Sequence, residues 1–178
     1  MISRRDALQR LSLLLGGALS AELTAGVLGQ VLNTGDSIEV MPDQVKLLAE
    51  AADTILPDTD TPGAKAAGAE QFIARVLHDC YVREEQTAFY DGLARLDAES
   101  RRVQGRGFAE LDAPQRKAQM AAAAKSDRPF FRRLRELTIV GYFTSEIGAT
   151  KALEYLPIPG RFAGDVPMTP GQKTWALF

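Results

Sequence analysis

Histidine and cysteine, which often carry redox, nucleophilic and metal chemistry, each occur once among the 178 residues, as His78 and Cys80. Residues two apart on a helix point about 200° away from each other, so these two side chains cannot hold one metal ion together. The sequence has no CxxCH haem motif, no CxxC pair and no GxSxG elbow. We therefore expect this chain to contribute no catalytic residue, no cofactor site and no metal site of its own.

The segment Asp58-x-Asp60-x-x-Gly63 resembles the start of a calcium-binding loop. A calcium loop needs an oxygen ligand at its fifth position and a glutamate at its twelfth. Here the fifth position is Pro62, and the nearest glutamate, Glu70, comes one residue late. We interpret the segment as a helix cap followed by a tight turn.

Cys80 closes an apolar stripe at helical spacing, formed by Phe72, Ile73, Val76 and Leu77. This spacing predicts a buried thiol within a hydrophobic core. Pairing with a thiol of another chain is the alternative, because a single cysteine in an exported protein has no partner in its own sequence.

The charge distribution argues against nucleic acid as a partner. The net charge is −2, and charged residues make up 25% of the chain. Arginines cluster at Arg101-Arg102 and at Arg132-Arg133-Arg135, but acidic residues lie close to each cluster. We expect both clusters to lie on a solvated or partner-facing surface rather than on a nucleic-acid footprint.

The N-terminus has the layout of an export signal. Arg4 and Arg5 follow a serine and precede an apolar run from Leu11 to Ala21, which resembles a twin-arginine signal. That run is too short to span a bilayer, and Glu22 ends it. We assign residues 1–32 to this signal segment; cleavage, and retention against a membrane or partner, both stay open.

The rest of the chain reads as helices. Apolar spacing and caps predict about five: one opened by Asp43 and stopped by Pro57, one near Pro62 to Cys80, and one ending near Gly105. Two more follow, one starting at a capping box of Asp112 and Gln115 with Leu111 as its staple, and one running from about Pro129 to Ser145. The sequence therefore predicts an all-α fold, a small helical bundle over residues 33–178.

Two regions of this domain look built for contact with another surface. The last helix is apolar almost all round between residues 137 and 143, so it must be covered on more than one side. Residues 149–178 carry too many prolines for a helix but hold large aromatics, which predicts an extended tail that docks on its own helices or on a partner. The predicted interface residues are Gly141, Tyr142, Phe143, Tyr155, Pro159, Phe162, Trp175 and Phe178.

Several blocks together resemble the gluconate 2-dehydrogenase subunit 3 family. They are the runs 53–57 (DTILP), 58–64 (DTDTPGA), 138–146 (TIVGYFTSE), 155–160 (YLPIPG) and 171–175 (GQKTW), in the family's order over about residues 40–178. The resemblance implies a non-catalytic small subunit of a periplasmic FAD-dependent dehydrogenase acting on sugars, glycosides or sugar acids. It also implies that this subunit supports export, folding and stability of the flavoprotein.

The partners implied by the resemblance are a large subunit of the glucose-methanol-choline oxidoreductase type holding FAD, a c-type cytochrome with haem c, and the twin-arginine export machinery. The complex would place the chain in the periplasm and could associate it with the membrane. The alternative is an independent exported helical domain, with a binding or structural role and no enzyme partner.

Overall fold

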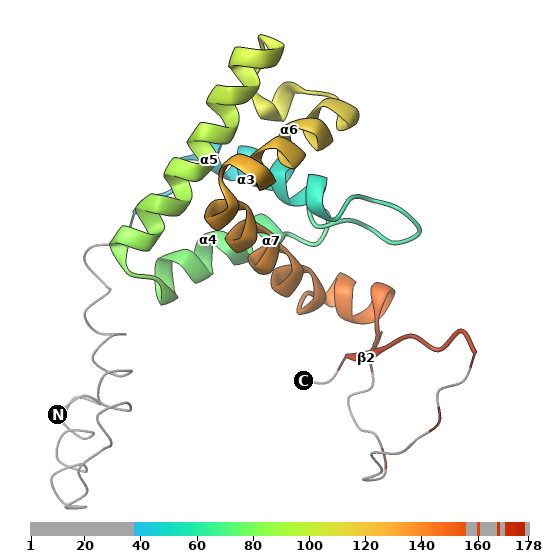
Figure 1. Ribbon diagram of the computed structural model, residues 1–178. Coiled ribbons are helices and arrows are strands. Elements are labelled where there is room, and N and C mark those ends of the chain that lie inside the picture. Colours follow the sequence, from blue (N-terminus) through green and yellow to red (C-terminus); the bar gives the residue numbers. More distant parts are fainter. Residues whose placement is uncertain (1–37, 156–159, 161–166, 168–169, 177–178) are drawn as a thin grey trace, which may run out of the picture. The chain divides into compact units, whose positions relative to one another are not determined.

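The computed structural model describes residues 38–155, 160, 167 and 170–176 (Figure 1). The predicted signal residues Arg4 and Arg5 lie outside these residues, and so do Pro159, Phe162 and Phe178. What the sequence predicts for those five positions stays a prediction.

The all-α prediction is confirmed within the described residues. Five α-helices and a short 3-10 turn, η1, precede a π-helical turn, η2, and two strands of two residues each (Figure 1). In chain order they are α3 (Pro42–Ile55), α4 (Ala69–Cys80), α5 (Arg83–Gln104), η1 (Phe108–Glu110), α6 (Ala113–Ser126), α7 (Arg128–Phe143), η2 (Gly148–Ala152), β1 (Glu154–Tyr155) and β2 (Trp175–Ala176).

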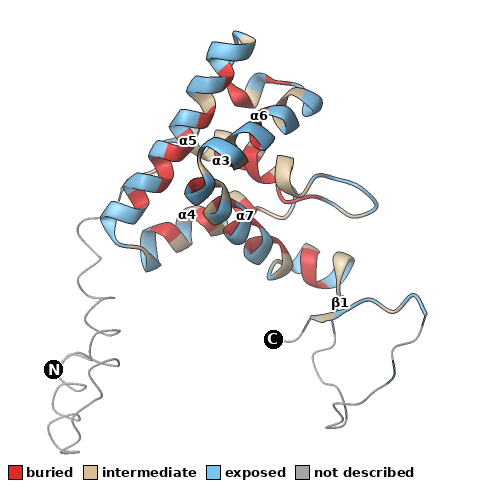
Figure 2. Ribbon diagram, in the orientation of Figure 1, coloured by how far each residue is buried: buried red, intermediate tan, exposed pale blue. Residues whose placement is uncertain are grey.

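Helix α3 is the centre of the bundle, because it contacts α4, α5, α6 and α7 as well as η1. Three of its four buried residues are alanines, so the surrounding helices can approach its backbone closely. The core around it is filled by larger side chains from the other elements, and Figure 2 shows the buried positions facing inward along α3, α5 and α7. Fully buried members include Leu48, Ile73, Leu93, Phe108 and Leu134.

The predicted start of the first helix is two residues late. Pro42 occupies the first turn, where a missing N–H costs least, and Met41 is the N-cap in place of Asp43. The predicted end is confirmed, since α3 stops at Ile55, two residues before Pro57. Gln44 supports the start because its side-chain oxygen accepts a hydrogen bond from the Met41 amide at 3.0 Å.

Pro62 does not begin a helix, contrary to the sequence prediction. It lies in the loop between α3 and α4, and α4 begins only at Ala69. The loop is closed on itself, because the Asp58 carboxylate accepts a hydrogen bond from the Gly63 amide and the Ala64 amide donates to Leu56 O at 2.8 Å. This confirms the tight turn expected for the calcium-like segment.

The predicted burial of Cys80 is wrong, since the thiol is exposed. Ile73 and Leu77 of the same stripe are buried, at 0% and 1% exposed. The difference lies in position, because Cys80 is the last residue of α4 and its neighbours His78 and Asp79 are exposed too. The apolar spacing is real, but the last turn of α4 extends beyond the helices that cover the earlier turns.

The predicted capping box of α6 is confirmed. Asp112 accepts a hydrogen bond from the Gln115 amide at 2.8 Å, the Gln115 side chain accepts one from the Asp112 amide at 3.3 Å, and Leu111 is 4% exposed. A cap that was not predicted from the sequence begins α7, where Asp127 accepts a hydrogen bond from the Phe130 amide at 3.4 Å. Each cap satisfies a backbone amide in the first turn of its own helix, and Asp127 does so directly after α6 ends at Ser126.

The described residues of the tail predicted from residue 149 include regular structure at 149–152, 154–155 and 175–176. A π-helical turn, η2, continues beyond α7, and Gly148 lies so close to Tyr142 O that a β-carbon there would be 1.9 Å from it. Only glycine fits this contact. β1 then pairs in parallel with β2, with Glu154 opposite Trp175 and Tyr155 opposite Ala176.

Candidate partner-binding surface

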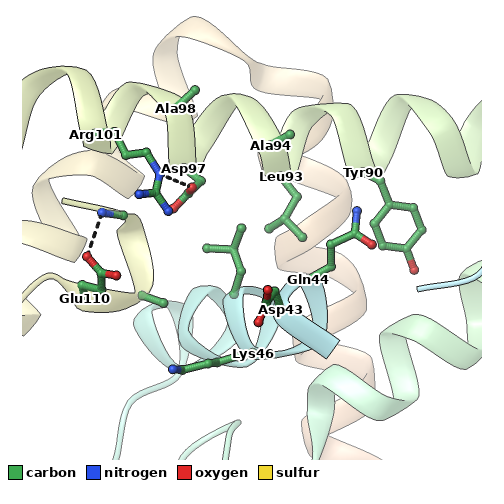
Figure 3. A pocket seen from close by; sticks show the side chains of 13 residues that line it. Asp43, Gln44, Lys46, Tyr90, Leu93, Ala94, Asp97, Ala98, Arg101 and Glu110 are labelled. Carbon is green, nitrogen blue, oxygen red and sulfur yellow. Dashed lines mark hydrogen bonds and ion pairs between the residues drawn. The ribbon is translucent and has the colours of Figure 1, made fainter. Parts of the chain in front are cut away.

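A groove between α3 and α5 gathers charged side chains of both signs around one hollow (Figure 3). It has a volume of about 510 Å³ and is floored by Leu47 and Leu93. The Asp97 carboxylate accepts hydrogen bonds from Arg101 Nε and from the Phe108 amide, each at 2.8 Å, and Glu110 accepts one from the Gly107 amide at 3.3 Å. The hydrogen bond from Phe108 to Asp97 therefore fastens η1 to α5, while the other two lie within α5 and at the start of η1. We assign the groove a structural role.

Tyr90 lines the same groove and is 6% exposed. Its hydroxyl has no hydrogen-bond partner among the residues the structure describes. Burial raises the pKa of Tyr90 to about 12, because the interior disfavours the phenolate. The hydroxyl is thus neutral at physiological pH and is no candidate for a general base.

Helix α7 carries three of the predicted interface residues, and the structure uses two of them inside the chain. A β-carbon at Gly141 would lie 2.7 Å from the Phe72 ring, so the glycine permits the close crossing of α7 over α4. Tyr142 is 4% exposed, and its hydroxyl donates to Pro62 O at 2.9 Å and lies 3.2 Å from Thr61 Oγ1. Both residues therefore hold α7 against α4 and the 57–63 loop.

Phe143, the third of these residues, is half-buried. Its ring meets the Tyr142 ring edge-on, with the two centroids 5.1 Å apart. Phe143 is the last residue of α7, and its burial lies between that of the core residues and that of the exposed ones.

The apolar surface that α7 leaves uncovered is formed by Ile139 and Val140, which are 38% and 48% exposed. The sequence analysis missed these two residues. Their signal is the spacing of the helix positions that pack inward, at 130, 134, 137, 138, 141 and 142, which leaves 139 and 140 on the opposite side. Exposed aliphatic side chains next to each other on a helix are a candidate contact with another protein.

The described part of the C-terminal segment supplies two further predicted interface residues. Tyr155 in β1 is 49% exposed, and Trp175 in β2 is half-buried. Trp175 pairs with Glu154 rather than with Tyr155, and the Glu154 amide donates to Thr174 O at 2.9 Å, so the two aromatics lie on neighbouring strands and on opposite faces of the sheet. The two aromatics are therefore presented by one small sheet.

Among the described residues, no group of three or more histidine, cysteine, aspartate or glutamate side chains lies close enough to hold a metal ion. No helix within the same residues combines the length and the hydropathy that crossing a membrane requires.

A family model described as gluconate 2-dehydrogenase subunit 3 matches residues 42–160, a range that includes the five α-helices of the described residues, η2 and β1. Neither the curated proteins nor the solved structures contain a match to the chain.

Proposed function

Because the chain belongs to the gluconate 2-dehydrogenase subunit 3 family, we propose that it is the non-catalytic small subunit of a periplasmic FAD-dependent dehydrogenase complex. The complex oxidises a sugar, a glycoside or a sugar acid. The family match over residues 42–160 carries this proposal, since it covers the whole helical bundle and names a subunit rather than a complete enzyme.

The uncovered surface of α7 supports a role in binding another chain. Ile139 and Val140 expose aliphatic side chains to solvent, and burial of such side chains favours association by about 25 cal/mol per Å² of apolar surface. Tyr155 and Trp175 add aromatic surface, which often dominates interface energies. We propose that the flavoprotein subunit covers both regions.

In this proposal the chemistry belongs to the partners. FAD is bound by a large subunit of the glucose-methanol-choline type, and electrons pass to a c-type cytochrome carrying haem c. The small subunit keeps the flavoprotein folded and carries the export signal for both through the twin-arginine machinery, with Arg4 and Arg5 as its recognition pair.

Purification of the tagged full chain from its native host tests the assembly. We expect a large subunit to co-purify with the absorbance spectrum of bound flavin, whereas the chain produced alone shows none. An independent exported helical domain would be recovered without a flavoprotein under the same conditions. Stoichiometric FAD in the chain produced alone would contradict the non-catalytic role.

A conservative double substitution tests the export role separately. Arg4→Lys with Arg5→Lys keeps the charge but removes the arginine pair, so we expect the chain and the dehydrogenase activity to stay in the cytoplasm. Arg10→Lys makes the same chemical change within the same segment and should leave export intact. Normal periplasmic activity in the double variant would reject the role of Arg4 and Arg5.

A further inference from the structure

The first half of α7 exposes a cluster of arginines. Arg128, Arg132 and Arg135 follow one another at intervals of four and three residues, so they share one face of the helix. Together with Pro129 and Phe131 they line a hollow of about 470 Å³ that begins at Ala124, near the end of α6. The hollow is therefore walled by cations and has an apolar floor.

The chain provides little negative charge for this cluster. Within residues 38–155, no carboxylate lies within ion-pair distance of Arg128 or Arg135. Arg132 Nε is 3.6 Å from Glu136 Oε1, but both side chains are more than half exposed, and such pairs contribute little. The nearby Asp127 carboxylate already pairs with Arg95 at 2.6 Å and caps α7.

The position of Arg128 in the helix is unfavourable for the fold itself. The N-terminal end of a helix carries a partial positive charge, which favours anions and disfavours cations in the first turn. Apart from its cap, α7 has no acidic residue in its first turn and has Arg128 at its first position. An anionic partner would relieve this repulsion between Arg128 and the end of its own helix.

The same helix face continues into the apolar surface described above. Ile139 lies four residues after Arg135, so the face passes from the arginine cluster to Ile139 and its neighbour Val140. A partner that covers the whole face must therefore offer negative charge at one end and apolar side chains at the other.

We propose that this face of α7 binds an acidic stretch of the partner polypeptide, whose carboxylates pair with Arg128, Arg132 and Arg135 while its apolar residues cover Ile139 and Val140. Arginine suits this role because its planar guanidinium pairs with a carboxylate through two parallel hydrogen bonds. The identity of the partner rests on the proposed function. The acidic and apolar character of the partner rests only on the surface of α7.

Two features favour a protein over a phospholipid bilayer as the occupant. The arginines line a hollow, into which a side chain can insert, whereas a bilayer presents a flat surface. The exposed apolar residues of the face are aliphatic, without the tryptophan or tyrosine side chains that gather at membrane interfaces.

A photo-crosslinking residue placed at Arg132 of the full chain, in the native host, identifies what covers this face. We expect a crosslink to a polypeptide whose captured peptide is rich in aspartate and glutamate. The same residue placed at Lys117, exposed on α6, serves as the control position. A crosslink to an acidic peptide of a protein that is neither a dehydrogenase subunit nor part of the export machinery keeps the surface proposal and rejects the proposed function.

Charge reversal of the arginine cluster is the second experiment that tests the proposal. Arg132→Glu with Arg135→Glu should lower the affinity for that captured polypeptide at least about tenfold, with a loss that shrinks as salt is added. Arg102→Glu with Arg106→Glu makes the same charge change at exposed positions elsewhere and should bind as the unchanged chain does. Equal binding by both double variants, or no polypeptide crosslink at Arg132, overturns the proposal. So does binding to phosphatidylglycerol vesicles that only Arg132→Glu with Arg135→Glu abolishes, since that result assigns the face to a membrane.

Discussion

The two faces of helix α7 differ in what they contact, although both are formed by residues 128–143. The inward face packs Phe130, Leu134 and Tyr142 against the core, whereas the outward face exposes the arginine cluster, Ile139 and Val140. Between residues 137 and 143 both faces are almost equally apolar, so hydrophobicity does not tell them apart. The contrast shows that an over-apolar helix can serve the fold with one side and association with the other, and that geometry decides which side does which.

The largest effect is expected on the inward face. Tyr142→Ala removes a buried ring and two hydrogen-bonding contacts, which should lower the free energy of unfolding by about 3–5 kcal/mol. Tyr142→Phe keeps the ring and should cost only about 1 kcal/mol. Urea unfolding of the full chain measures both values. Equal stability of the two variants would contradict the packing role of the ring.

On the outward face we expect binding to change while stability does not. Val140→Asp places a charge in the proposed interface and should weaken binding to the flavoprotein by about 2 kcal/mol. Its unfolding free energy should stay within about 0.5 kcal/mol of the unchanged chain, because the site is exposed. Val103→Asp on α5 is a close control, since Val103 is 50% exposed and Val140 48%. Titration calorimetry of both variants would show the difference, and equal affinities would remove α7 from the interface.

A smaller loss is expected from filling the close contact on the inward face. Gly141→Ala adds one methyl group 2.7 Å from the Phe72 ring, so the ring or the helix must shift. Such overpacking costs about 1–3 kcal/mol of stability. Gly105→Ala is the comparison without a steric clash. Its β-carbon would have open space, and any loss of stability would come from the backbone φ of +71° at that position. Thermal unfolding that is unchanged by Gly141→Ala would mean that the α4–α7 crossing is looser than described.

The smallest effect concerns a buried hydroxyl that, unlike that of Tyr142, has no partner among the described residues. Tyr90→Phe should change stability at neutral pH by less than about 1 kcal/mol, because no hydrogen bond is lost. The pKa of Tyr90 is raised from 10.0 to about 12, so its neutral form is stabilised by folding. The unchanged chain should therefore lose stability as the pH rises from about 10 towards 12, and Tyr90→Phe should lose less. Parallel pH curves for the two proteins would contradict the burial of the hydroxyl.

The features that the sequence predicted well are set by short-range chemistry. The capping box of Asp112 and Gln115 and the stop of α3 before Pro57 depend only on residues within a few positions of each other. Two errors concern helix ends, the start of α3 and the helix expected at Pro62, and the error at Cys80 concerns tertiary coverage. Neither the exposure of Cys80 nor the burial of Tyr142 follows from spacing, because each depends on which distant segments lie against it. The pairing of β1 with β2 joins residues too few and too far apart in sequence to leave a periodic signal.

That parallel pairing has a consequence for how the chain can vary in length. Two parallel neighbours cannot be joined by a tight hairpin, so the chain leaves β1 and returns through residues 156–174 before β2 begins. The entropy of closing such a loop grows only with the logarithm of its length, and doubling it costs about 0.6 kcal/mol. Residues could therefore be inserted or removed between the strands at little thermodynamic cost, provided that enough remain for the return. For protein engineering, an added peptide or label in this connection should disturb the helical bundle little.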